Sequence, residues 1–201
     1  GKALDVADSE IQLADMNGDG IQDIVRIQLN QVQYWPGRGN GEWGTGKLGD
    51  CRSGRVADNR FVKMGAFPDY QNIAGDSIRL DDVNGDGLDD IVLVSISAFS
   101  VWLNVDGHGW TGRAQFRGSP PAPAFSNKVR LNDINGSGTR DIVWGEAERY
   151  QYIDLAGGER PGLLVQVNNG LGKSTAVEYS TSTAEMLAAA RLTRLAELPE
   201  P

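Results

Sequence analysis

Aspartate and asparagine side chains recur at every second position in three short, glycine-rich stretches of the sequence. The first stretch reads DMNGDGIQD, over residues 15–23. Oxygen atoms spaced in this way can surround a hard cation such as Ca²⁺, which takes about six to eight oxygen ligands. The same carboxylates would repel one another in so tight a turn without a counter-charge. We therefore predict that each stretch is a calcium-binding loop.

The expected ligands are at positions 1, 3, 5, 7 and 9 of each loop, and the position-7 residue contributes its backbone carbonyl. In the first loop they are Asp15, Asn17, Asp19, Ile21 and Asp23. In the second loop they are Asp82, Asn84, Asp86, Leu88 and Asp90. In the third loop they are Asp133, Asn135, Ser137, Thr139 and Asp141. The serine of the third loop replaces a carboxylate with a neutral hydroxyl, so we expect calcium in the first two loops and leave the third open.

Two other kinds of loop have a similar composition. An EF-hand needs a bidentate glutamate at position 12 and a helix on each side. Position 12 is Arg26, Leu93 or Trp144, and both flanks have the pattern of strands, which excludes the EF-hand. Asx-rich turns that cap strands without a metal are the remaining alternative. Repetition in matching contexts favours a cation with a structural role, whose binding energy would add to the stability of the fold.

The loops belong to longer repeats that align without a gap. The three copies read IQLADMNGDGIQDIV (11–25), IRLDDVNGDGLDDIV (78–92) and VRLNDINGSGTRDIV (129–143). In the first two copies, tryptophans follow the last loop aspartate by 12 and 20 residues, at Trp35 with Trp43 and at Trp102 with Trp110. A register kept over this length indicates a structural repeat.

Each repeat has the pattern of four short strands. Alternating triplets lead into the loop, a β-branched run leaves it, and a third run precedes a glycine-rich turn and a fourth strand. We therefore predict an all-β protein of four-stranded β-propeller blades over residues 1–160. Three copies are fewer than the about four to eight blades that close a propeller, so the ring is either incomplete or has degenerate blades in 40–75 and 110–127. We interpret the tryptophans as core between blades rather than as a platform for sugars.

Two further elements are expected after the blades. The run LLVQVNNGLGKSTAVEYS predicts a β-hairpin with an Asn-Gly turn, within a segment assigned to 161–183. A phosphate-binding P-loop is disfavoured there, because Val167 stands where that motif needs glycine and a strand pattern follows. The run TAEMLAAARLTRLAEL predicts a helix with Thr183 as its N-cap, in a helical tail assigned to 184–201. This tail either docks on a neighbouring domain or frays.

Composition excludes several classes of function. The formal charge of −8 argues against a nucleic-acid partner, which would require a basic face. No apolar stretch approaches the roughly 20 residues of a membrane-spanning helix, and the first ten residues have no apolar signal core. The one histidine, His108, falls in a predicted turn, and the one cysteine, Cys51, falls in a polar insert over 46–61. No constellation for nucleophilic or acid–base catalysis is present, so we expect a protein that is not an enzyme.

The loops resemble the FG-GAP/VCBS-type calcium repeats of integrin-like β-propellers. A more specific resemblance begins at Phe125. The runs NGSGTRDIVW and NNGLGKSTAVEYSTST are similar to the B component of insecticidal toxin complexes and to the related virulence-plasmid SpvB-type proteins. This resemblance covers most of the chain and is strongest over 125–190.

The resemblance implies a secreted protein with two kinds of partner. In that family a β-propeller docks onto a pore-forming A component and closes a hollow shell, built with the Rhs-repeat C component, around a toxic cargo. The chain would then supply propeller blades and the first hairpin of the shell. The alternative is an independent extracellular adhesion or glycan-binding propeller, which should end in a blade that closes the ring.

Overall fold

The computed structural model describes residues 11–28, 31–39, 41–45, 60–65, 77–95, 98–117, 129–146, 149–158 and 160–196. Most of the polar insert, including Cys51, lies outside these residues. The described chain is nearly all β. Its strands form several separate antiparallel sheets, and none of these sheets closes into a barrel. The prediction of an all-β, propeller-like fold is thus confirmed.

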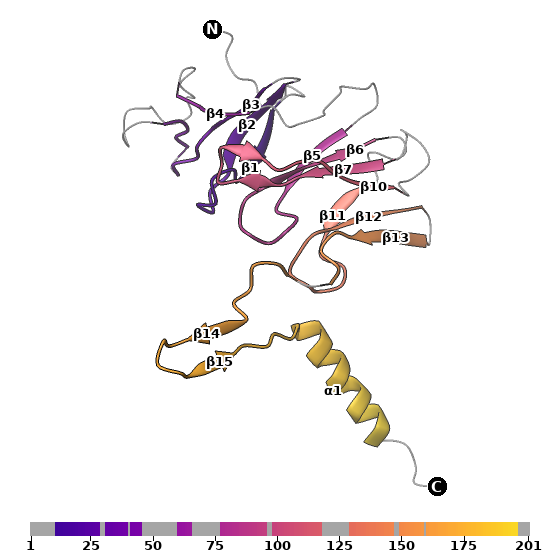
Figure 1. The fold of residues 1–201 in the computed structure, drawn as a ribbon. Coiled ribbons are helices and arrows are strands. Elements are labelled where there is room, and N and C mark those ends of the chain that lie inside the picture. The colour runs from indigo at the N-terminus through magenta and orange to yellow at the C-terminus, as the bar shows by residue number, and fades with distance from the viewer. Residues whose placement is uncertain are drawn as a thin grey trace.

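Three of the sheets correspond to the three sequence repeats and are called blades 1, 2 and 3 (Figure 1). Blade 1 consists of β1 (Ile11–Ala14), β2 (Asp23–Gln28), β3 (Gln31–Trp35) and β4 (Val62–Met64). Blade 2 consists of β5 (Ser77–Asp81), β6 (Asp90–Val94), β7 (Ala98–Trp102) and β10 (Ala114–Arg117). Blade 3 consists of β11 (Arg130–Asn132), β12 (Asp141–Glu146) and β13 (Arg149–Asp154). The glycine-rich loop of each blade connects its first strand to its second.

The sequence allowed two interpretations of residues 40–75 and 110–127. They could contain the fourth strands of the first two blades, or they could contain degenerate blades. The structure places β4 and β10 as the outer strands of blades 1 and 2, paired with β3 and β7 respectively. The described parts of 40–75 and 110–127 therefore complete known blades. Blade 3 has three strands among the described residues, so the expected fourth strand is not seen there.

A small hairpin interrupts blade 2 between its third and fourth strands. It pairs β8 (Asn104–Val105) with β9 (Gly109–Trp110) through a turn in which Asp106 and Gly107 have φ of 51° and 70°. Blade 1 has an isolated bridge between Gly37 and Trp43 at the corresponding place. The predicted turn around His108 is confirmed, and its ring is exposed.

Apolar side chains from neighbouring blades form shared cores. One cluster joins blades 1 and 2 and buries Trp102 completely. A second cluster joins blades 2 and 3, and Ile153, at the corresponding place in the third repeat, packs against it. Trp35 occupies this place in blade 1, where it is also buried and meets Phe61 edge-to-face at 5.5 Å between ring centroids. The interpretation of these positions as core between blades is confirmed for Trp102.

The segment after blade 3 forms a hairpin and a helix that project away from the blades (Figure 1). The hairpin pairs β14 (Gln166–Asn168) with β15 (Ser174–Ala176), as predicted. Its turn is fixed by Asn169, whose side-chain oxygen accepts N–H bonds from Leu171 and Lys173 at 2.8 and 3.0 Å.

No helix among the described residues is long and apolar enough to span a membrane.

The helix α1 (Ser182–Ala196) starts earlier than the sequence suggested. The hydroxyl of Thr181 accepts the N–H of Ala184 at 3.1 Å, so Thr181 is the N-cap and the assignment of Thr183 was wrong. The physical reason is that an N-cap must stand just outside the first turn to reach a free N–H two or three residues on. Ser180 also donates to the Glu185 carboxylate at 2.6 Å, which adds a second contact across the start of the helix.

Candidate metal centres

The position-1 aspartate organises each of the three loops in the same way. In the first loop, the carboxylate of Asp15 accepts N–H bonds from Gly18 at 2.8 Å, Asp19 at 3.3 Å and Gly20 at 2.7 Å. Asp82 and Asp133 accept bonds from the same relative positions, at 2.7–3.1 Å. The loops therefore share one backbone conformation.

Positions 3 and 5 complete this network within each loop. In the first loop, Asn17 accepts the N–H of Asp19 at 3.0 Å, and Asp19 accepts the N–H of Ile21 at 2.8 Å. The second loop repeats both contacts, at 2.9 and 2.8 Å. In the third loop, the hydroxyl of Ser137 accepts the N–H of Thr139 at 3.4 Å, where the other loops use a carboxylate. Serine thus preserves the turn but supplies no charge.

The position-4 glycines also allow a close approach by the next unit of the chain. Gly18 has φ of 76°, and a Cβ there would lie 3.2 Å from the side chain of Leu88 in the second loop. A Cβ on Gly136, in the third loop, would lie only 2.5 Å from the hydroxyl of Thr183. The start of α1 therefore lies against the third loop, as the second loop lies against the first.

The position-9 aspartates of the first two loops are buried, and each ties the start of its loop to the segment that follows the third strand of the blade. Asp23 is fully buried, and its two oxygens accept N–H bonds from Met16 at 3.0 Å and Gly37 at 2.6 Å. Asp90 accepts corresponding bonds from Val83 at 3.1 Å and Asn104 at 2.8 Å. Both aspartates therefore have a structural role that needs no cation.

Burial also shifts the titration of these carboxyls. It raises the pKa of Asp23 to about 6 and that of Asp90 to about 7, although the two backbone N–H bonds to each carboxyl act in the opposite direction. The neighbouring loop carboxylates raise both values further. A cation in the loop would supply the charge that favours the ionised form.

The donor set suits a hard cation, because each loop offers oxygens of the kind that calcium prefers. A carboxylate has about four acceptor sites, and Asp15 uses three of them for loop N–H groups. These carboxylate oxygens therefore point toward the N–H groups of their own loop. Among the described residues, no three histidine, cysteine, aspartate or glutamate side chains form a group that could hold a metal ion. The assignment of calcium to the loops therefore stays a prediction.

Contacts between blades depend on residues that sequence reasoning did not select. Asp89, at position 8 of the second loop, accepts the N–H of Asp15 at 2.6 Å and donates its own N–H to the Asp15 carbonyl at 2.8 Å. Position 8 of the third loop is Arg140, which forms an ion pair with Asp81 of blade 2 at 3.1 Å. Because position 8 differs in every copy, the repeat pattern carries no signal for this role.

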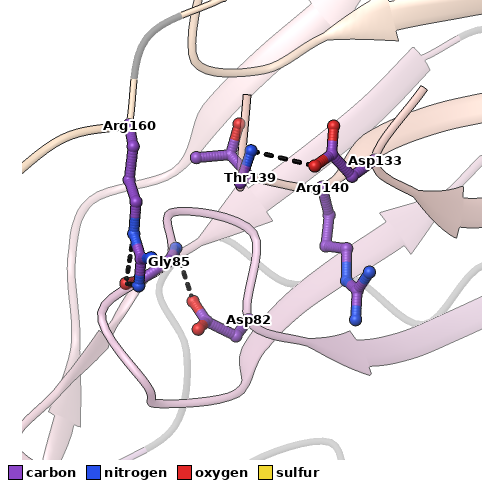
Figure 2. Close-up of a pocket in the computed structure, with 7 residues that line it drawn as sticks. Asp82, Gly85, Asp133, Thr139, Arg140 and Arg160 are labelled. Atoms are coloured by element: carbon purple, nitrogen blue, oxygen red, sulfur yellow. Dashed lines mark hydrogen bonds between the residues drawn. The ribbon is translucent and has the colours of Figure 1, made fainter. Parts of the chain in front are cut away.

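A cavity of about 210 Å³ lies where the second and third loops face one another (Figure 2). Arg160 enters it from one side and donates to the carbonyl of Gly85, and Arg140 lies at the other side. The carboxylates of Asp82 and Asp133 also line it. The cavity is thus polar and carries both signs of charge.

Comparison with known proteins identifies the repeat. Residues 82–144 match the FG-GAP-like repeat. This range includes the whole of the second loop and the third loop. Comparison with curated proteins gives no match.

Solved structures show the same fold at low sequence identity. The TcdB2–TccC3 crystal structure matches with a TM-score of 0.67 and 21% identity, over 97% of this chain and 9% of that one. The Photorhabdus luminescens Tc holotoxin pore matches with a TM-score of 0.52 and 22% identity, over 77% of this chain and 7% of that one. A lectin of Agrocybe aegerita that recognises non-reducing terminal N-acetylglucosamine matches with a TM-score of 0.52 and 17% identity, over 84% and 38%. The chain thus spans a small part of the toxin proteins that it is similar to.

Proposed function

We propose that the chain is a calcium-stabilised, non-enzymatic β-propeller segment of a secreted toxin complex. It would belong to a B-type component that docks onto a pore-forming A component and, with an Rhs-repeat C component, closes the shell around a cargo. The similarity to TcdB2–TccC3 supports this proposal most directly, because it covers 97% of the chain. Such coverage includes the hairpin β14–β15 and most of α1 as well as the blades.

The exposed surface of the C-terminal segment supports a position inside a larger protein. Large apolar side chains project from it without cover among the described residues, and such patches mark contact surfaces. Those with at least about half of their surface exposed are Leu164, Val165, Val167, Leu171, Tyr179, Met186 and Leu187.

A binding experiment on the full-length protein that contains this chain tests the docking role. Purified pore-forming A component would be immobilised, and association would be followed by biolayer interferometry. We expect saturable binding. A chelator should weaken this binding, because removal of calcium from the loops would destabilise the propeller. A glycan array probed with the same protein tests the adhesion alternative. Absence of binding to the A component would overturn the docking proposal, whatever the glycan array shows.

A further inference from the structure

Blades 1 and 2 each have a face that the following blade covers. Alternate residues of a strand point to opposite faces of its sheet, so equivalent positions on the second and third strands identify this face in every blade. In blades 1 and 2, the side chains at three such positions are at most 5% exposed and belong to the cores shared with the following blade. They are Val25, Val32 and Tyr34 in blade 1 and Val92, Phe99 and Val101 in blade 2.

Blade 3 leaves the equivalent face exposed. Val143 lies opposite Tyr152 in the pairing of β12 with β13, as Val92 lies opposite Val101 in blade 2. Tyr150 is 77% exposed and Tyr152 is 51% exposed, whereas Val143 is half-buried. These three residues are called the outer face of blade 3. Among the described residues, the strands that follow β13 pair only with each other, so no later blade covers this face.

The outer face keeps the apolar bulk of a packing surface. Gly145 lies opposite Tyr150, where blade 2 pairs Val94 with Phe99. A Cβ on Gly145 would lie only 2.6 Å from the ring of Tyr150, so the ring takes the space that a side chain would fill there. A larger residue thus compensates for a smaller one on the same face. Exposed apolar patches of this kind mark contact surfaces.

The counterpart of Tyr152 in blade 1 shows how a following blade covers this position. Tyr34 lies opposite Val25, at the place that Tyr152 holds opposite Val143. The hydroxyl of Tyr34 lies at the turn of the β8–β9 hairpin of blade 2, where a Cβ on Gly107 would be 2.8 Å from it. The missing side chain of this glycine therefore makes room for the tyrosine.

Blade 1 does not offer blade 3 a complementary surface. Its face away from blade 2 includes Ile11, Ile24 and Trp35, which are at most 7% exposed. Phe61 and Trp43 pack against these residues, and the ring of Phe61 meets that of Trp35 at 5.5 Å between centroids. Contact with blade 1, in a ring of three blades or in a second copy of the chain, would have to displace these side chains.

We propose that the outer face of blade 3 packs against a further blade of the same polypeptide, outside these 201 residues, and that a tight turn of that blade covers Tyr152 as the turn at Gly107 covers Tyr34. Two interfaces of this kind already exist in the chain, between blades 1 and 2 and between blades 2 and 3. The inference deepens the proposed function and rests on its claim that the chain is one segment of a longer propeller.

Site-specific photo-cross-linking in the full-length protein that contains this chain tests the contact. With p-benzoylphenylalanine in place of Tyr152, irradiation should link residue 152 to a turn of another blade in the same polypeptide, and mass spectrometry would identify that turn. The same replacement of Tyr34 is the positive control and should give a link to the β8–β9 turn. Replacement of Val105, which is 44% exposed in blade 2, is the negative control and should give no link within the protein.

The destination of the cross-link decides between the possible occupants. A link to blade 1, a covalent dimer, or a link to a segment outside any blade would overturn the inference. Absence of a link at residue 152, when the Tyr34 control succeeds, would also overturn it. A link to a further blade together with no binding to the A component would retain the inference and overturn only the docking part of the proposed function.

Thermal denaturation of the same full-length protein provides a second measurement. Tyr152→Arg should lower the melting temperature of the propeller by at least about 4 °C, because it places an unpaired charge in a covered interface. Val105→Arg is the matched control, since it puts the same charge at a position of similar exposure, and it should leave the melting temperature nearly unchanged. Circular dichroism confirms that both variants are folded. Equal melting temperatures for the two variants would show that the outer face is exposed to solvent and would contradict the inference.

Discussion

At the scale of single residues, the position-9 aspartate joins three segments of its blade. Asp23 begins β2, accepts an N–H from the start of its loop at Met16, and accepts another from Gly37 after β3. Both of its oxygens are used, and the side chain is fully buried. The same residue was predicted as a calcium ligand, so its structural role and its predicted ligand role must be separated by experiment.

Replacing Asp23 with asparagine should destabilise the protein even without calcium. Asparagine can accept only one of the two N–H bonds, and its amide would then face the other buried donor. Leaving a buried donor without a partner costs about 1–3 kcal/mol of unfolding free energy. Urea denaturation in a chelator measures the loss. Asp19→Asn is the control, because Asp19 is exposed and uses one oxygen, which asparagine retains. Equal effects of the two variants would contradict the structural role.

The raised pKa values predict how stability depends on pH in a chelator. Burial raises the pKa of Asp23 and of Asp89 to about 6 and that of Asp90 to about 7, from 3.8. The folded protein therefore keeps these protons to higher pH than the unfolded chain does. Their contribution to stability is present below about pH 4 and is lost as pH rises toward 7.

Denaturation curves at about pH 5 and about pH 7.5 test this dependence. The unfolding free energy should be lower at the higher pH in a chelator, and the slope should be smaller in Asp23→Asn. Added calcium should restore stability mainly at the higher pH, because its ligands must be ionised. A slope that is the same in Asp23→Asn and in the unchanged chain would show that this carboxyl does not titrate as described.

At the scale of elements, the β8–β9 hairpin joins blade 2 to blade 1. Asn104 is 4% exposed, and its amide donates to the carbonyls of Met16 at 2.9 Å and Asp89 at 3.2 Å. Its oxygen accepts the N–H of Gly107 at 3.0 Å. The hairpin turn, the first loop and the second loop therefore meet at one buried side chain.

Asn104→Ala should weaken the contact between the two blades. The change leaves buried polar groups on three backbone segments without their partner, and we expect a loss of about 1–3 kcal/mol. Thermal denaturation followed by circular dichroism measures the effect. Asn132→Ala, on the exposed side of β11, should leave the melting temperature nearly unchanged. A comparable fall in both variants would mean that the hairpin does not hold the blades together.

At the scale of the whole molecule, the loops lie along one series of contacts that continues into the C-terminal segment. The first loop meets the second at Gly18 and Leu88, and the third meets the start of α1 at Gly136 and Thr183. The conformation of the loops therefore affects the position of α1 as well as the packing of the blades.

Calcium should raise the melting temperature of the whole chain. A ligand that binds only the folded state adds about 2.7 kcal/mol per site at a concentration a hundredfold above its dissociation constant. Differential scanning calorimetry with calcium and with excess chelator measures the difference, and magnesium at equal concentration controls for ionic strength. A melting curve that is the same with calcium and with chelator would contradict a stabilising role.

Much of the local structure could be predicted from the sequence. The alternating oxygens and glycines of the loops predicted three copies of one turn, and the apolar alternation around them predicted β1, β2 and their counterparts. The Asn-Gly turn predicted the hairpin β14–β15. These features depend on backbone preferences and side-chain contacts within about ten residues. The N-cap at Thr181 was missed because neighbouring Ser and Thr residues all suit that role.

The sequence by itself determined which turns and strands form, because local hydrogen bonds and apolar periodicity are written in consecutive residues. Only the tertiary structure decided which side chains meet across blades. The Asp89 carboxylate bonds to the backbone of Asp15, and the Asn104 amide bonds to the backbone of Met16, in pairs that are separated by 74 and 88 residues. Such pairs follow from the way the blades pack, and a repeat pattern cannot show them because they occupy positions that differ from copy to copy.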